Sequence, residues 1–94
     1  MEVVISRSFM KDLKLKPKTV LHAVEKLIAQ LEASTSLEKS GVDFKKMEGQ
    51  KKGENYYLIR LGTWRIGIEY IHPKIIVLRI LARGEVYKYF PPQG

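Results

Sequence analysis

The C-terminal half of the chain contains three segments rich in aromatic and β-branched residues, and the connections between them are very short. The segments span residues 55–61, 64–71 and 75–82, and the connections are Gly62-Thr63 and His72-Pro73-Lys74. A connection of two or three residues cannot carry the chain across to a parallel neighbour, so consecutive strands must pair antiparallel. The spacing therefore predicts a three-stranded antiparallel meander, in which Gly62 opens a type II′ turn.

The N-terminal half has the apolar spacing of helices. After a short β-branched strand at residues 3–5, Ser8 is placed to cap a first helix that Pro17 interrupts. From about Lys18 to Ser34, apolar residues recur every three or four positions and form one stripe of a second helix: Val20, Leu21, Val24, Leu27, Ile28 and Leu31. The predicted order is β-α-α-β-β-β, a single α+β domain over residues 1–94 with both helices packed on one face of an antiparallel sheet.

Two further segments are less regular. Residues 35–54 are rich in Lys, Glu, Gly and Ser and are expected to form a connection, with Val42, Phe44 and Met47 as anchors onto the core. Residues 85–90 fit either a short strand or a helical turn, and Pro91-Pro92 ends that element.

Composition excludes several kinds of chemistry. The chain has no cysteine, which removes disulfides and thiolate nucleophiles, and its two histidines, His22 and His72, have no second ligand at metal-binding spacing. We therefore expect no metal and no cofactor. With neither a signal peptide nor an apolar run long enough to span a membrane, a cytoplasmic protein is expected. Seventeen Lys and Arg against ten Asp and Glu give a net charge of +7, which favours a polyanionic partner.

Strand alternation predicts a cluster of arginines. Trp64, Ile66, Ile68 and Tyr70 share the expected core face of the middle strand, whereas Arg65 lies on the other face. If Gly62-Thr63 is a two-residue turn, Arg60 falls directly opposite Arg65, although like charges in opposed positions destabilise a sheet. Arg79 is expected on that face one strand further on, and Arg83 and Tyr87 follow the last strand. Because a guanidinium can grip two phosphate oxygens, the pattern indicates an anion site.

A second interpretation of these arginines stays open from the sequence. They could form a solvated face or pair with the carboxylates of Glu48, Glu69 and Glu85, as single surface arginines usually do. In that case the repeated spacing would have no functional meaning.

Three stretches of the sequence resemble the RelE/ParE toxin superfamily. They are Phe44-Lys45-Lys46-Met47-Glu48-Gly49, Tyr57-Leu58-Ile59-Arg60-Leu61-Gly62-Thr63-Trp64-Arg65-Ile66, and Arg83-Gly84-Glu85-Val86-Tyr87. Phe9, Lys11 and Leu13 at the start and the long second helix also fit, so the resemblance covers nearly the whole chain. The order and spacing of the stretches are more specific than any one of them.

For RelE-like members, the resemblance implies ribosome-dependent cleavage of mRNA in the A site by attack of the RNA's own 2′-hydroxyl, without metal or cofactor. Arg65 would bind the scissile phosphate and Arg60 would assist from across the hairpin. Arg83 would contact transition-state charge, and Tyr87 would stack on a base or transfer a proton. The residues expected to contact RNA beside them are Lys45, Lys46, Arg79 and Lys88.

The chain departs from the RelE pattern on the first hairpin strand. RelE-like enzymes often carry two lysines there, where this sequence has Leu58 and Arg60. Arginine holds its proton too firmly to act as a good general base, so Glu48, Lys46 and Tyr87 remain the candidate bases.

Three functions are compatible with these observations. The first is the toxin of a type II toxin–antitoxin system that acts as an mRNA endoribonuclease, paired with a cognate antitoxin whose acidic, partly helical segment covers a hydrophobic groove or the arginine face. The alternative within the superfamily is a ParE-like inhibitor of DNA gyrase without catalytic activity. The third is a basic RNA-binding domain with no toxic role.

Overall fold

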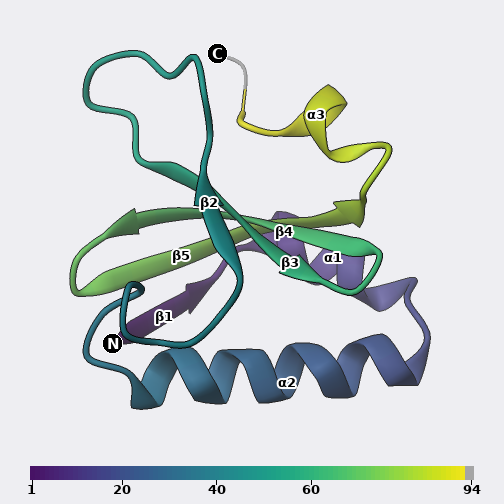
Figure 1. Ribbon diagram of the computed structural model, residues 1–94. Coiled ribbons are helices and arrows are strands. Elements are labelled where there is room, and N and C mark those ends of the chain that lie inside the picture. Colours follow the sequence, from purple (N-terminus) through teal and green to yellow (C-terminus); the bar gives the residue numbers. More distant parts are fainter. Residues whose placement is uncertain (93–94) are drawn as a thin grey trace.

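The predicted meander forms the centre of the sheet. In the computed structural model, which describes residues 1–92, β3 (Tyr56–Leu61), β4 (Trp64–Ile71) and β5 (Lys74–Ala82) pair antiparallel (Figure 1). Their bounds agree with the predicted segments to within one residue. Gly62 has a φ of 59° and Thr63 does not have a positive φ, as the predicted type II′ turn requires.

The complete sheet has five strands and is mixed. β1 (Glu2–Ile5) pairs parallel with β5, and β2 (Phe44–Lys46) pairs antiparallel with β3, which gives the order β1-β5-β4-β3-β2. The α+β class and the order of the predicted elements are confirmed, but the expectation of a wholly antiparallel sheet was wrong for β1. Short connections dictate pairing only between consecutive strands, whereas two helices separate β1 from the rest of the sheet.

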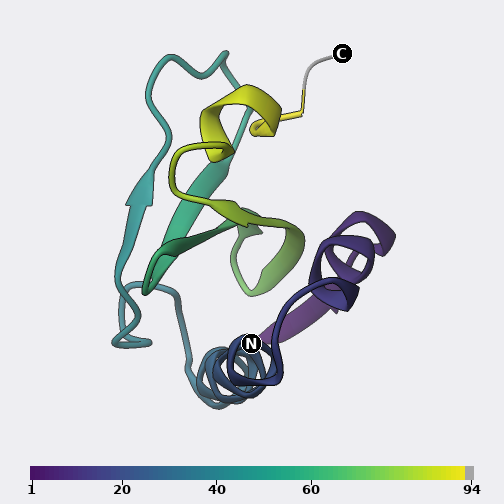
Figure 2. The ribbon, with the colours of Figure 1, turned by 90° about the vertical axis from the view of Figure 1, so that its right-hand side faces the viewer.

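The two N-terminal helices cover one face of this sheet (Figure 2). α1 (Arg7–Lys14) is capped by Ser6, whose hydroxyl accepts from the backbone N–H of Phe9; the cap was expected at Ser8, two residues later. α2 (Lys18–Ala33) begins after Pro17 and ends before Ser34, as predicted. Within residues 1–92, neither these helices nor α3 (Val86–Tyr89) is long and apolar enough to cross a membrane.

A bulge in β5 changes which of its side chains face the helices. Ile66 pairs with Ile80 and Ile68 pairs with Val77, so Leu78 has no partner on β4. As a result Ile75, Val77 and Ile80 are buried in the helix-covered core. The middle strand follows the prediction, since its alternate residues Ile66, Ile68 and Tyr70 are all buried in this core.

The opposite face of the sheet is covered in part by α3, which resolves the ambiguity of residues 85–90 in favour of a helical turn. A second apolar cluster forms there from Met47, Leu58, Val86 and Phe90. The Phe90 ring is 1% exposed and lies directly over Gly67 in the middle of β4. Glycine is required at this position because a Cβ on Gly67 would lie 2.6 Å from the ring.

Substitution of Gly67 should show how tightly α3 is docked. Alanine normally stabilises a strand relative to glycine, but in Gly67→Ala the new methyl group collides with Phe90, so we expect a net loss of about 1–3 kcal/mol in the free energy of unfolding. Urea denaturation measures the change. Gly84→Ala is the matched control, because a Cβ at Gly84 meets no atom within 4 Å. Equal stability of the two variants would contradict the close docking of Phe90.

Candidate anion-binding site

The predicted arginine pair is present in the hairpin. Arg60 on β3 pairs directly with Arg65 on β4, and the backbone N–H of Arg60 donates to the carbonyl of Asp43 at 2.8 Å. The carboxylate of Asp43 lies 3.5 Å from Nε of Arg60, although both side chains are well exposed. Asp43, Arg60 and Arg65 therefore lie in one row across the sheet, with a carboxylate at the edge that offsets part of the repulsion between the two cations.

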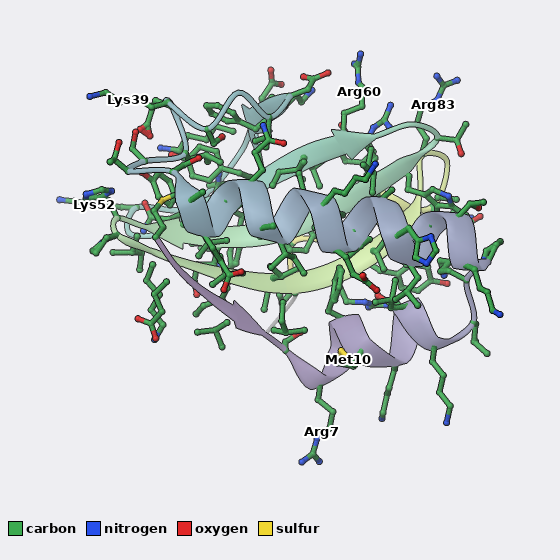
Figure 3. All side chains as sticks on the ribbon, turned by 90° about the horizontal axis from the view of Figure 1, so that it is seen from below. Arg7, Met10, Lys39, Lys52, Arg60 and Arg83 are labelled. Atoms are coloured by element: carbon green, nitrogen blue, oxygen red, sulfur yellow. The ribbon has the colours of Figure 1, made fainter. Side chains whose placement is uncertain are left out.

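A pocket of about 200 Å³ opens above this row. It is lined by Asp43, Phe44, Lys45, Leu58, Arg60, Arg65, Arg83 and Tyr87. Four of these side chains are cations and one is a carboxylate, and the buried Leu58 supplies an apolar floor. Figure 3 shows Arg60 and Arg83 projecting at the same end of the molecule. A concave surface with this excess of positive charge is suited to an anion.

Arg65 is held in a defined orientation. One of its terminal nitrogens donates to the carbonyl of Gly62 at 2.9 Å and to that of Trp64 at 2.8 Å. These contacts fix the guanidinium against the hairpin turn, and they leave Nε and the second terminal nitrogen to donate to a ligand. Less side-chain entropy is then lost when an anion binds.

Arg83 and Tyr87 reach the pocket from the C-terminal segment. The backbone N–H of Arg83 donates to the carbonyl of Thr63 at 3.0 Å, which ties the segment to the hairpin turn. Phe90 anchors the other end of α3 against Gly67, and Tyr87 between them is 62% exposed. An exposed tyrosine on a docked helical turn presents its ring and hydroxyl at the pocket rather than in the core.

Three of the eight predicted site residues lie outside the pocket. Arg79 lies on the same face of the sheet, but it donates to Asp12 on α1 at 2.8 and 3.1 Å, and these hydrogen bonds raise the pKa of Arg79. Lys46 lies over the ring of Tyr57, 6.0 Å from its centre. Lys88 lies 3.5 Å from the Glu85 carboxylate. The pocket brings together the other five, which are Lys45, Arg60, Arg65, Arg83 and Tyr87.

The arginines form ion pairs with carboxylates other than those considered from the sequence. Glu48, Glu69 and Glu85 were the expected partners, but Arg60 pairs with Asp43 and Arg79 with Asp12. Asp43 was missed because it precedes a strand of only three residues inside a segment that has the composition of a connection. Its one sequence signal is its place immediately before Phe44, the first residue of the RelE-like stretch.

The fold and the pocket define a class: a small basic α+β domain with a cation-lined pocket on the open face of its sheet. The chain is 40% identical over 91 residues to Toxin RelE3 of Methanocaldococcus jannaschii, covering 97% of this chain and all of that protein. A chain of a RelB-RelE antitoxin-toxin complex from Methanococcus jannaschii superimposes with a TM-score of 0.76 at 38% identity, covering 94% of this chain and 99% of the other. This protein therefore belongs to the RelE toxin family.

A more distant solved structure has the same fold. A chain of an archaeal RelE-RelB complex from Pyrococcus horikoshii matches with a TM-score of 0.68 at 25% identity, covering 90% of this chain and 97% of the other. No protein-family model matches the sequence.

Neutralising Asp43 tests the electrostatics of the pocket. In Asp43→Asn the lining loses its carboxylate, so we expect inorganic phosphate to bind about two- to fivefold more tightly, the range for an exposed ion pair. Isothermal titration at low and high salt measures the effect, which should shrink as salt screens it. Glu32→Gln, on the exposed surface of α2, serves as the control for net charge. An unchanged phosphate affinity in Asp43→Asn would show that Asp43 does not oppose anions there.

Proposed function

We propose that this protein is the toxin of a toxin–antitoxin pair and that it cleaves mRNA on the ribosome, in the cytoplasm, without a metal. The observation that carries the proposal is the pocket, where four cations and an exposed tyrosine predicted from the RelE resemblance meet on one surface. Family membership supports the toxin role, and the net charge of +7 supports a polyanionic substrate.

The pocket suits cleavage by the RNA's own 2′-hydroxyl. In that reaction the 2′-oxygen bonds to the adjacent phosphorus, the bond to the 5′-oxygen of the next nucleotide breaks, and that oxygen takes a proton. Arg65, fixed at the hairpin turn, would grip two phosphate oxygens, while Arg60 and Arg83 face the charge that accumulates on phosphorus. The protein then contributes orientation and charge stabilisation.

Proton transfer needs groups other than the arginines, which stay protonated. Of the bases considered from the sequence, Lys46 lies over Tyr57 and Glu48 does not line the pocket, whereas Tyr87 does. Tyr87 and the carboxylate of Asp43 are thus the two pocket groups able to exchange a proton with the 2′-hydroxyl or the leaving oxygen.

One observation favours the gyrase alternative. Leu58, at a position where RelE-like enzymes often carry a lysine, is only 4% exposed and belongs to the apolar cluster under α3. The site therefore has one cation fewer than the family pattern. A protein that only binds gyrase would not need that cation.

Arg65→Ala is the direct test of the endoribonuclease. Losing one preorganised donor to transition-state charge typically lowers the rate by ~10²–10³, so mRNA cleavage and toxicity should fall together. Folding should be unchanged or slightly improved, since the repulsion from Arg60 is removed. Mapping mRNA ends after incubation with translating ribosomes measures the cleavage.

Two outcomes would change the assignment. If folded Arg65→Ala cleaved mRNA at the parental rate, Arg65 would have no role in the reaction. If the parent protein were toxic but left mRNA intact while inhibiting gyrase, the ParE-like function would replace the endoribonuclease.

The antitoxin partner is supported by the two archaeal neighbours, which are antitoxin-toxin complexes. A groove of about 390 Å³ between α1 and α2 has the expected chemistry for an acidic helix. It is lined by Arg7, Met10, Lys11, Leu13, Lys14, Lys16, Lys18 and Leu21. The apolar residues include Met10, which is 55% exposed, and the rim is entirely cationic. An amphipathic helix with flanking carboxylates complements such a surface.

Asp12 keeps this rim cationic by facing inward. It is the one acidic residue of α1, and it accepts from Arg79 and from the backbone N–H of Ile80. Arg7 projects from α1 on the opposite side of the molecule from Arg60 and Arg83 (Figure 3). An antitoxin helix in this groove would therefore not cover the arginine pocket, which another segment of the same antitoxin could cover.

Met10→Glu tests this docking site. A carboxylate in the apolar part of the groove would oppose an acidic apolar helix, so we expect at least about a tenfold loss of antitoxin affinity, mainly through faster dissociation. Surface plasmon resonance with the antitoxin from the native operon measures it. Ile71→Glu introduces the same charge at an equally exposed apolar residue outside the groove, where it should have little effect. Equal loss in both variants would contradict docking between α1 and α2.

A further inference from the structure

Arg79 links three elements that are distant in the chain. It lies on β5, and two nitrogens of its guanidinium donate to the carboxylate of Asp12 on α1, at 2.8 and 3.1 Å. The same guanidinium lies over the ring of Tyr89 on α3, 5.7 Å from the ring centre, which is within the range of a cation–π contact. Arg79 therefore connects α1 to the C-terminal segment that carries Tyr87.

Asp12 fixes the orientation of this guanidinium. Besides the two hydrogen bonds from Arg79, its carboxylate accepts the backbone N–H of Ile80 at 3.0 Å, and the side chain is only 13% exposed. α1 itself is tied to β5 beside this contact, since the hydroxyl of Ser6 donates to the carbonyl of Leu78 at 3.1 Å. A bidentate pair with a carboxylate on an anchored helix leaves the planar guanidinium little freedom. The cation is therefore presented to α3 in a set position.

The position of Tyr87 depends on how α3 is rotated. Val86 and Phe90 lie four residues apart, are both buried, and form the line along which α3 packs on the sheet. Since a helix turns by about 100° per residue, Tyr87 and Tyr89 lie on opposite sides of that line. Tyr87 lines the arginine pocket, and Tyr89 contacts Arg79. A rotation of α3 about this line that lifted Tyr89 from Arg79 would therefore also move Tyr87 relative to the pocket.

We propose that Arg79 is a positioning residue for the arginine pocket, although it does not line it. Through its contact with Tyr89 it sets the rotation of α3, and this rotation presents Tyr87 to the pocket. The consequence for catalysis rests on the proposed RNA-cleaving function, whereas the contact itself belongs to the free protein. This role differs from the RNA contact predicted for Arg79 from the sequence.

NMR of protein with labelled tyrosine rings tests the rotation of α3 without requiring cleavage. In the parent, inorganic phosphate bound among the arginines should shift the ring signal of Tyr87, which is assigned with Tyr87→Phe. Tyr89→Leu removes the aromatic face from a side chain that is 53% exposed, so the fold should be retained. We expect the phosphate-induced shift of Tyr87 to shrink in this variant, while the affinity for phosphate is unchanged because every cation of the pocket is present.

Hydrogen exchange gives a second measure of how firmly α3 is held. The backbone N–H of Phe90 donates to the carbonyl of Val86 at 2.9 Å, so its exchange reports opening of this turn. In Tyr89→Leu we expect this amide to exchange about two- to fivefold faster, which corresponds to the loss of an exposed cation–π contact.

Tyr89→Phe is the matched control, because it keeps the aromatic face that Arg79 contacts and removes only the hydroxyl. It should behave as the parent does. Arg79→Gln removes the cation from the same contact and should reproduce the effect of Tyr89→Leu on Tyr87. Because both residues act through one contact, the double variant should be no worse than either single variant. If Arg79→Gln does not fold because Asp12 loses its ion pair, the two Tyr89 variants still decide the matter.

Four results would overturn the proposal. They are an undiminished Tyr87 shift in Tyr89→Leu, an equal loss in Tyr89→Phe, additive losses in the double variant, and a parent in which bound phosphate leaves the Tyr87 signal unchanged.

Rates of mRNA cleavage on translating ribosomes separate this inference from the proposed function. A lower kcat in Tyr89→Leu that is restored in Tyr89→Phe, with KM unchanged, supports both. Parental cleavage by folded Tyr89→Leu removes the positioning role and leaves the endoribonuclease intact. The expected Tyr87 response without any cleavage by the parent supports the positioning of Tyr87 and removes the endoribonuclease.

Discussion

The pairing register of β3 and β4 is the constraint on which the site depends. Ile59 and Ile66 lie opposite each other and are both buried, so a slip of one residue would turn them toward solvent. Burial of such a side chain contributes about 1.5–3 kcal/mol, whereas interactions between exposed charges contribute at most about 1 kcal/mol. Burial therefore decides the register, and Arg60 must face Arg65 despite their repulsion.

The two faces of the sheet are buried to different extents, and the difference creates the pocket. α1 and α2 cover one face over its length, while α3 covers only part of the other (Figures 1 and 2). Phe90 on Gly67 holds α3 in place, and the uncovered part of this face is where Arg60 and Arg65 meet Arg83 and Tyr87. The apolar contact that anchors the C-terminal segment thus also sets the geometry of the charged site.

The positive charge is divided between two surfaces on opposite sides of the molecule. One is the arginine pocket, and the other is the groove between α1 and α2, as the positions of Arg60 and Arg7 show (Figure 3). Asp12 and Asp43 act in opposite ways on these surfaces. Asp12 is turned inward to Arg79, so the rim of the groove stays cationic. Asp43 lies within the arginine pocket and lowers its net positive charge.

The sequence by itself determined the meander, the long helix and the facing arginines, because these depend on local periodicity and on two short turns, and its three motif stretches carried the RelE resemblance. Only the tertiary structure decided the partner of β1, the bulge at Leu78 and the docking of Phe90, since each depends on contacts between residues distant in the chain. Contacts between distant residues also decided which of the predicted site residues line the pocket. Arg79 has the alternation of the other arginines, but packing of α1 against β5 brings Asp12 to it and removes it from the pocket.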